Sequence, residues 1–164
     1  MPVRVRPITL WRAEVDNQPG LLAQTLEALA AAGADLQVVM GYRLPGDRAR
    51  AAIEVFPVTG ARVLYAAQAA GLSEAAISAL QVEGHNRAGL AYAIAKGLAN
   101  AGINIDFFLA QVSRRRHTTV IGFESRGDAE RAIPLIKRAA AAPPRKPSAR
   151  KAAHKGARGV TKAA

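Results

Sequence analysis

The chain has 164 residues, half of them hydrophobic, with no cysteine and a formal net charge of +11. This length suits one large domain or two small ones, and the lack of cysteine excludes disulfides, thiol nucleophiles and thiolate metal sites. No stretch approaches the ~18 consecutive apolar residues of a membrane-spanning helix. The basic N-terminus lacks the apolar segment of a secretory signal, so we expect a cytoplasmic protein that does not bind membranes.

The net charge is concentrated at one end of the chain. Residues 143–164 hold seven of the 23 Lys and Arg residues and no acidic residue, which leaves 16 basic and 12 acidic residues in the rest of the chain. The segment is rich in Ala, Pro, Lys and Arg and has almost no large apolar side chain, so we expect it to be a disordered basic tail.

The hydrophobic pattern changes its period in a regular order along the body of the chain. In chain order it predicts a strand over 8–15, a helix from Leu21 to a glycine cap at Gly33, strands over 35–44 and 48–58, and a second helix over 60–70 capped by Thr59. The second half then predicts a strand over 77–82, a helix from Leu90 to Gly102, strands over 103–113 and 117–124, and a helix from Asp128, its expected N-cap, to about Arg138. Pro134 is expected to kink or shorten this last helix.

The two halves are copies of one unit. Gly20 in "DNQPGLL" aligns with Gly89 in "HNRAGLA", and Gly33 aligns with Gly102, at the same offset of 69 residues. Each unit reads strand–helix–strand–strand–helix. It needs one more strand, and the chain after the second unit offers none because it runs into the tail.

The same offset indicates where the missing strand comes from. Residues 3–6, "VRVR", map onto residues 72–75, which close the first unit. We therefore predict that this N-terminal strand pairs at the edge of the second unit's sheet, so that the two halves depend on each other.

The loop D-x-x-P-G-L, followed by a helix that ends in A-G and a strand hairpin, resembles the ACT domain, and the repeat over residues 7–138 resembles stand-alone proteins with two ACT modules in tandem. The resemblance implies an α+β fold with two ferredoxin-like βαββαβ modules, antiparallel sheets and helices on one face of each sheet. The expected modules are 1–72 and 73–142, with the strand over 73–84 shared between them. It also implies a non-catalytic regulatory protein that binds an amino acid or a similar small carboxylate and forms a homodimer.

The chemistry of the repeated loop agrees with this implication. A helix that begins at a glycine leaves its first N–H groups without intrahelical partners, at the positive end of the helix dipole, where a carboxylate can dock. The first copy keeps the full motif, whereas the second has His85 and Ala88 in place of Asp16 and Pro19, so we favour the first loop if only one binds. The expected ligand-binding residues are Asp16, Asn17, Gln18, Gly20, Leu21 and Leu22 in the first loop, and Asn86, Arg87, Gly89, Leu90 and Ala91 in the second.

Two other functions stay open at this point. The basic tail over 143–164 would bind nucleic acid without sequence preference and with a strong dependence on salt, and a repeat without a ligand would be a protein-interaction module. The sequence has no nucleophile–base set, no phosphate-binding glycine loop and no histidine spacing typical of metal ligands. We therefore expect no catalytic residues, no metal and no cofactor.

Overall fold

The computed structural model describes residues 3–142. The basic tail, with the disorder and the nucleic-acid binding predicted for it, lies outside the described residues. The first half of the chain contains β1 (Arg4–Ile8), β2 (Trp11–Asp16), α1 (Leu21–Ala31), β3 (Val38–Arg43), β4 (Arg50–Phe56), α2 (Ala61–Ala69) and β5 (Ser73–Glu74). The second half contains β6 (Ser78–His85), α3 (Leu90–Asn100), β7 (Phe107–Ser113), β8 (Arg116–Phe123) and α4 (Arg126–Ala141).

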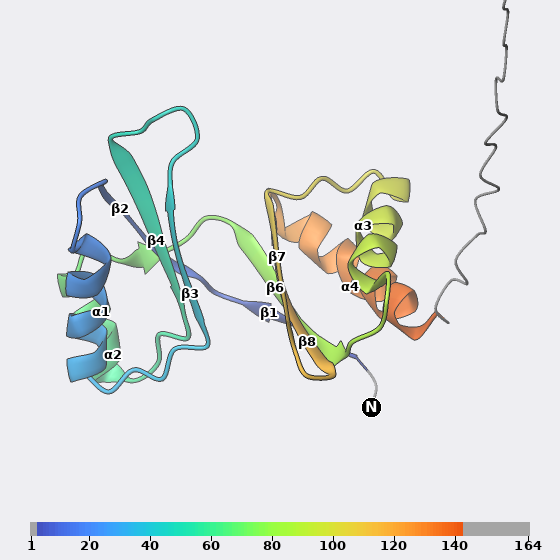
Figure 1. Ribbon diagram of the computed structural model, residues 1–164, viewed down its shortest axis with the longest axis horizontal. Helices are drawn as coiled ribbons and strands as arrows, with labels where there is room; N and C mark the ends of the chain where they lie inside the picture. The colour runs from blue at the N-terminus through green and yellow to red at the C-terminus, as the bar shows by residue number, and fades with distance from the viewer. Residues whose placement is uncertain (1–2, 143–164) are drawn as a thin grey trace, which may run out of the picture.

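These elements form two antiparallel four-stranded sheets of the same topology. The strand order is β3-β4-β2-β5 in the first sheet and β1-β6-β8-β7 in the second. Each order is that of a ferredoxin-like βαββαβ module, once β1 is counted as the fourth strand of the second. The expected fold class is therefore confirmed: the helices of each module cover the outer face of its sheet, and the two sheets lie between the helix layers (Figure 1).

The N-terminal strand completes the second sheet, as the repeat offset predicts. β1 pairs antiparallel with β6, from Arg4 opposite Glu83 to Ile8 opposite Ala79. Pro7 is tolerated in this strand because β1 lies at a sheet edge, where a missing N–H need not break the ladder. The segment expected to be one shared strand over 73–84 is divided into β5 and β6, which belong to different sheets. The module boundary at residue 72 stays a prediction.

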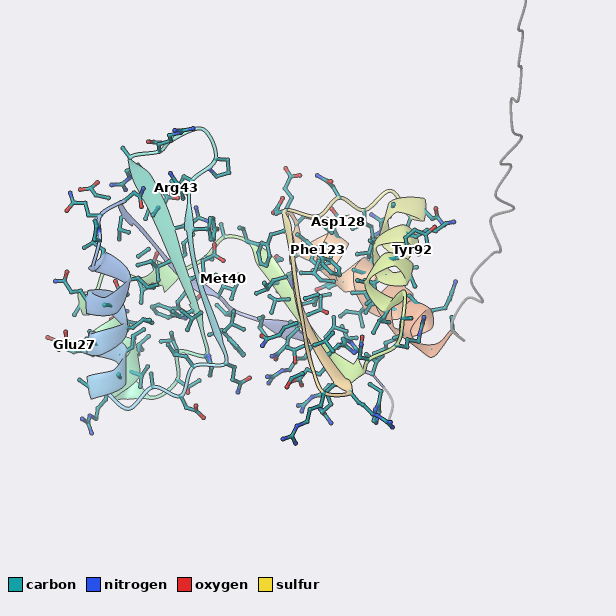
Figure 2. All side chains as sticks on the ribbon, in the orientation of Figure 1. Glu27, Met40, Arg43, Tyr92, Phe123 and Asp128 are labelled. Atoms are coloured by element: carbon teal, nitrogen blue, oxygen red, sulfur yellow. The ribbon has the colours of Figure 1, made fainter. Side chains whose placement is uncertain are left out.

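Each module has its own core between sheet and helices, and a third cluster joins the two sheets. In the first core, Trp11, Ile53 and Val55 pack against Leu29 and Val63. The second core is built from β6, β8, α3 and α4. The joining cluster contains Ile8, Leu10, Val38, Ala79 and Val120, with Met40 and Phe107 packed against it; Met40 lies on the side of β3 that faces the second sheet (Figure 2).

Two predicted helix starts are wrong. Helix α2 begins after Gly60, and no side chain caps it, so Thr59 is not its cap. Helix α4 is capped by Ser125, whose Oγ accepts the N–H of Asp128 at 3.0 Å. Asp128 is instead the third helical residue, where its carboxylate favours the positive end of the helix dipole.

The last helix also runs further than predicted. Pro134 lies inside α4, which continues to Ala141 instead of ending near Arg138. Ala132 and Ile136, on either side of Pro134, are fully buried, so tertiary packing holds the helix across the hydrogen bond that proline cannot donate. Among the described residues, every helix is too short or too polar to cross a membrane.

Candidate ligand-binding site

The two repeated loops turn into their helices with the same geometry. Gly20 and Gly89 are the N-cap residues of α1 and α3, with φ of 93° and 75°, and neither helix has a side-chain cap. Each glycine carbonyl accepts the N–H of the residue four positions later at 2.9 Å. Glycine is required because other residues rarely adopt this left-handed conformation. The N–H groups at the start of each helix thus have no side-chain acceptor, although the first one donates to a loop carbonyl, Leu21 N to Gln18 O at 3.5 Å and Leu90 N to Arg87 O at 3.2 Å.

An asparagine ties each loop to the neighbouring strand hairpin. The backbone N–H of Asn17 donates to Ala49 O at 2.7 Å, and its side-chain Nδ2 donates to Arg48 O at 3.0 Å. In the second copy, the N–H of Asn86 donates to Arg115 O at 2.8 Å. The side chain of Asn17 therefore helps to hold the first loop against its hairpin, whereas in the second loop the contact is made by the backbone of Asn86.

A cavity of about 280 Å³ lies beside the first loop. Asp16 stands at its rim, where Oδ1 accepts Nη1 of Arg50 at 2.9 Å. The side chain of Leu22, 41% exposed, reaches over Gly41 of the edge strand β3. The predicted residues Asp16, Asn17, Gln18, Leu21 and Leu22 all line this cavity, together with Val15 and residues from β3 and β4 (Gly41, Tyr42, Arg43, Ala51, Ala52 and Ile53).

A buried polar network adjoins the cavity through Tyr42. Glu54 is fully buried, and its Oε1 accepts Nη1 of Arg12 at 2.9 Å and the hydroxyl of Tyr42 at 2.8 Å. Burial, together with the hydrogen bond and charge of Glu54, raises the pKa of Tyr42 to about 12. Sequence analysis missed Tyr42, Arg43 and Glu54. The alternation of apolar and polar residues along a strand does not show which polar side chain will contact a side chain on a neighbouring strand.

The second loop presents its side chains differently. Nη2 of Arg87 donates to Ala139 O, in the last turn of α4, at 2.7 Å. The side chain of Leu90 is buried in the second core, and its backbone N–H donates to Arg87 O at 3.2 Å. Ala91 is exposed at the first turn of α3. Arg87 and Gly89 line a separate cavity between α3 and α4. The same loop motif thus opens onto two different surfaces in the two modules.

The remaining polar candidates do not gather into a metal site in the described range. His117 is buried on β8, with Nδ1 3.2 Å from the carbonyl oxygen of His85. Within residues 3–142, no three His, Cys, Asp or Glu side chains are grouped closely enough to hold a metal ion.

Comparison with known proteins places this geometry in a known fold. No protein-family model and no curated protein matches the sequence. Among solved structures, a protein from Bacteroides thetaiotaomicron has a TM-score of 0.65 at 14% identity, over 82% of this chain and 89% of that chain. The ligand-free regulatory subunit of aspartate kinase from Thermus thermophilus has a TM-score of 0.57 at 20% identity, over 85% of this chain and 97% of that one.

A putative C-terminal regulatory domain of aspartate kinase from Porphyromonas gingivalis gives a TM-score of 0.52 at 9% identity, over 85% of this chain and 98% of that chain. The chain has the fold of these regulatory domains. The resemblance to tandem ACT modules, inferred from the repeated loop, is confirmed at the level of the fold.

Proposed function

We propose that this protein is a non-catalytic regulatory protein that senses an amino acid, or a similar small carboxylate, through the loop at Asp16–Gly20. The cavity of about 280 Å³ beside that loop carries the proposal. Its volume is just below the ~300–1,000 Å³ range of ligand pockets, which favours a ligand the size of an amino acid. The similarity to regulatory subunits of a kinase, as opposed to its catalytic part, supports a regulatory role.

The groups around this cavity complement both ends of an amino acid. The N–H groups at the start of α1 suit a carboxylate, and the carboxylate of Asp16 suits an ammonium group. The apolar surface of Leu21, Leu22 and Ile53 remains for the side chain of the ligand. A few charge-assisted contacts of ~1.5–3 kcal/mol each, reduced by the cost of association, give affinities of roughly micromolar to millimolar, which suits a sensor.

We also propose that the protein is a homodimer joined at the open sheet edges. β3 and β7 are edge strands of the two sheets, and their exposed apolar side chains include Val39 at 43% and Val112 at 53%. Unprotected edges with apolar side chains favour pairing with another strand. Equilibrium sedimentation of the protein and of Val39→Lys and Val112→Lys variants tests the dimer. A monomeric wild-type protein at micromolar concentration overturns it.

Titration calorimetry with each of the twenty amino acids tests the ligand. We expect at least one to bind, and to stabilise the protein by ~2.7 kcal/mol at 100 times its Kd. Asp16→Asn should weaken this binding, and Gly41→Val should block it, because a side chain at Gly41 projects toward Leu22 and the cavity. Asp35→Asn, which changes an exposed carboxylate in the loop after α1, is the matched control. Twenty titrations without heat or thermal shift at millimolar ligand would refute the sensor.

A further inference from the structure

A second cavity, of about 730 Å³, lies between α3 and α4 in the second module. The core side chains of these helices, such as Ile94, Leu98 and Ile136, do not line it, so it opens between the helices and outside the core. Figure 1 shows the two helices side by side on the outer face of the second sheet, and Tyr92, which lines the cavity, lies on α3 (Figure 2). The volume is that of a pocket for a complete small molecule.

The charged residues that line this groove are all cationic. Arg87, Lys96 and Arg138 line it, and none of its thirteen lining residues is acidic. None of the three takes part in the five salt bridges found among residues 3–142. Uncompensated positive charges around one concave surface attract an anion, because low-dielectric walls focus their field.

Arg87 is only partly satisfied at this site. Its two Nη groups donate to the carbonyl oxygens of Ala139 at 2.7 Å and Ala88 at 3.4 Å. Its Nε is buried and has no hydrogen-bond partner within the described chain. A buried donor without an acceptor is unusual in folded proteins, and an anion in the groove lies close to the positive charge of this guanidinium.

Apart from Asn100 and the hydroxyl of Tyr92, the remainder of the lining is apolar, and it leaves room. Ala93, Gly97 and Leu135 contribute carbon surface, and a Cβ added at Gly97 would meet no other atom within 4 Å. The Nζ atom of Lys96 lies over the ring of Tyr92, 5.8 Å from the ring centroid. A ligand that fits must therefore combine an apolar body with an anionic end.

We propose that the α3–α4 groove is a second binding site, which takes a free organic anion with an aliphatic or aromatic body. The chain's own segment 143–164 is a poor occupant, since it adds seven Lys and Arg residues and no acidic residue. The groove lies in the other module from the cavity at Asp16–Gly20, and the proposal does not rest on the amino-acid sensor. Residues of the second loop, Arg87 to Gly89, line one side of this groove, which takes a different ligand from the first loop.

The fluorescent probe 8-anilinonaphthalene-1-sulfonate, an aromatic anion, tests the groove in the full-length protein. We expect saturable binding of one probe per chain, and competition by decanoate. The neutral N-phenyl-1-naphthylamine should bind at least tenfold more weakly. Equal binding of the charged and neutral probes, or fluorescence that rises without saturation, overturns the proposal.

Three variants locate the probe. Lys96→Gln combined with Arg138→Gln should raise the Kd at least tenfold, whereas Lys137→Gln, an exposed cation of α4 outside the groove, should change it less than twofold. Gly97→Leu should abolish saturable binding without lowering the thermal midpoint, because the new side chain enters open space in a helix. The Gly97→Leu variant still has the basic tail, so a probe that binds the tail would bind this variant too. Saturable binding that survives in Gly97→Leu therefore lies outside the groove and refutes the proposal.

Two further measurements distinguish the groove from the first cavity and from a site for lipid surfaces. Gly41→Val, which fills the cavity at the first loop, should leave probe binding unchanged; loss of binding there would assign the probe to that cavity. Sedimentation with phosphatidylglycerol vesicles should not depend on Lys96 and Arg138. If it does, and decanoate does not displace the probe, the groove binds a lipid surface and the free-ligand proposal fails.

Discussion

Arg12 and Glu54 form an ion pair in the first sheet, with Nη1 2.9 Å from Oε1, and the Glu54 side chain is completely buried. The two residues stand directly opposite each other on β2 and β4. Ile53 and Val55, the neighbours of Glu54, point into the core under the helices, so the pair lies on the face of the sheet away from α1 and α2. A buried carboxylate is tolerated there only because Arg12 and Tyr42 hold it.

Breaking this pair from one side should be costly. Arg12→Leu leaves a buried carboxylate without its cation, and we expect it to lower the free energy of unfolding by about 3 kcal/mol. Adding Glu54→Leu should recover most of this loss, since an apolar pair of similar size needs no compensation. Urea denaturation of the wild type, the two single variants and the double variant measures the coupling. Additive effects would contradict the proposed dependence.

The N-terminal strand should support the second module and not the first. Val5 packs against the second core, whereas Arg4 is exposed. Val5→Asp places a charge at that core and should destabilise the protein by about 2 kcal/mol; Arg4→Gln, an exposed change in the same strand, should change stability by less than about 0.5 kcal/mol. Amide hydrogen exchange should quicken in β6 and β8 while β4 keeps its protection. Equal loss of protection in both sheets would show that the two modules unfold as one unit.

The cap of α4 can be tested with a built-in control. Ser125→Ala removes the acceptor for the Asp128 N–H and should cost ~1 kcal/mol. Thr59→Ala, at the position just before the cap of α2, should cost almost nothing, because Gly60 begins that helix and no side chain caps it. Thermal unfolding of the two variants measures the difference. A larger cost at Thr59 than at Ser125 would reverse the assignment of the caps.

Protonation of His117 should weaken the fold. Burial lowers the pKa of His117 below its ordinary value of 6.5, against the opposing effect of the His85 and Gly84 carbonyls. The unfolded chain therefore takes up the proton first, so stability falls as the pH drops below about 6.5 and levels off below the folded pKa. In His117→Gln, stability should not fall between pH 6.5 and the lower pKa that His117 has in the folded protein.

The control for His117 is its neighbour in the same ladder. His85→Gln removes an exposed ring and keeps the backbone carbonyl that faces His117. Its stability should follow the wild-type pH profile when both are measured by urea denaturation between about pH 7.5 and 5, the range around the ordinary histidine pKa. A profile as flat as that of His117→Gln would assign the titration to His85.

The parts of the fold that repeat in the sequence were predictable. The constant offset between Gly20 and Gly89 predicts two equal helix starts, and the match of residues 3–6 to 72–75 predicts the pairing of β1 with β6, which the register confirms. Such features follow from local turn chemistry and from the need of each sheet for a fourth strand.

The details that depend on contacts between distant parts of the chain were not predictable from the sequence. Serine and aspartate are both good N-caps, so the sequence alone does not favour Ser125 over Asp128. Arg87 was expected at a ligand carboxylate, and that role is untested, but its guanidinium contacts α4, a helix far along the chain. Small residues recur one helical turn apart at Ala93 and Gly97 on α3 and at Ala101, its C-cap. They were the signal for the groove between the helices, and only the placement of α4 gives this signal meaning.

The pairing of β1 with β6 also sets the order in which the chain can fold during its synthesis. β1 leaves the ribosome before the first module, yet its partner β6 emerges only after that whole module. The first sheet can close as soon as β5 is made, whereas β1 must wait, unpaired, while about seventy residues are added. A circular permutant that starts at Leu10 and carries residues 3–9 behind Ala142, through a short linker, would let each module fold from contiguous chain.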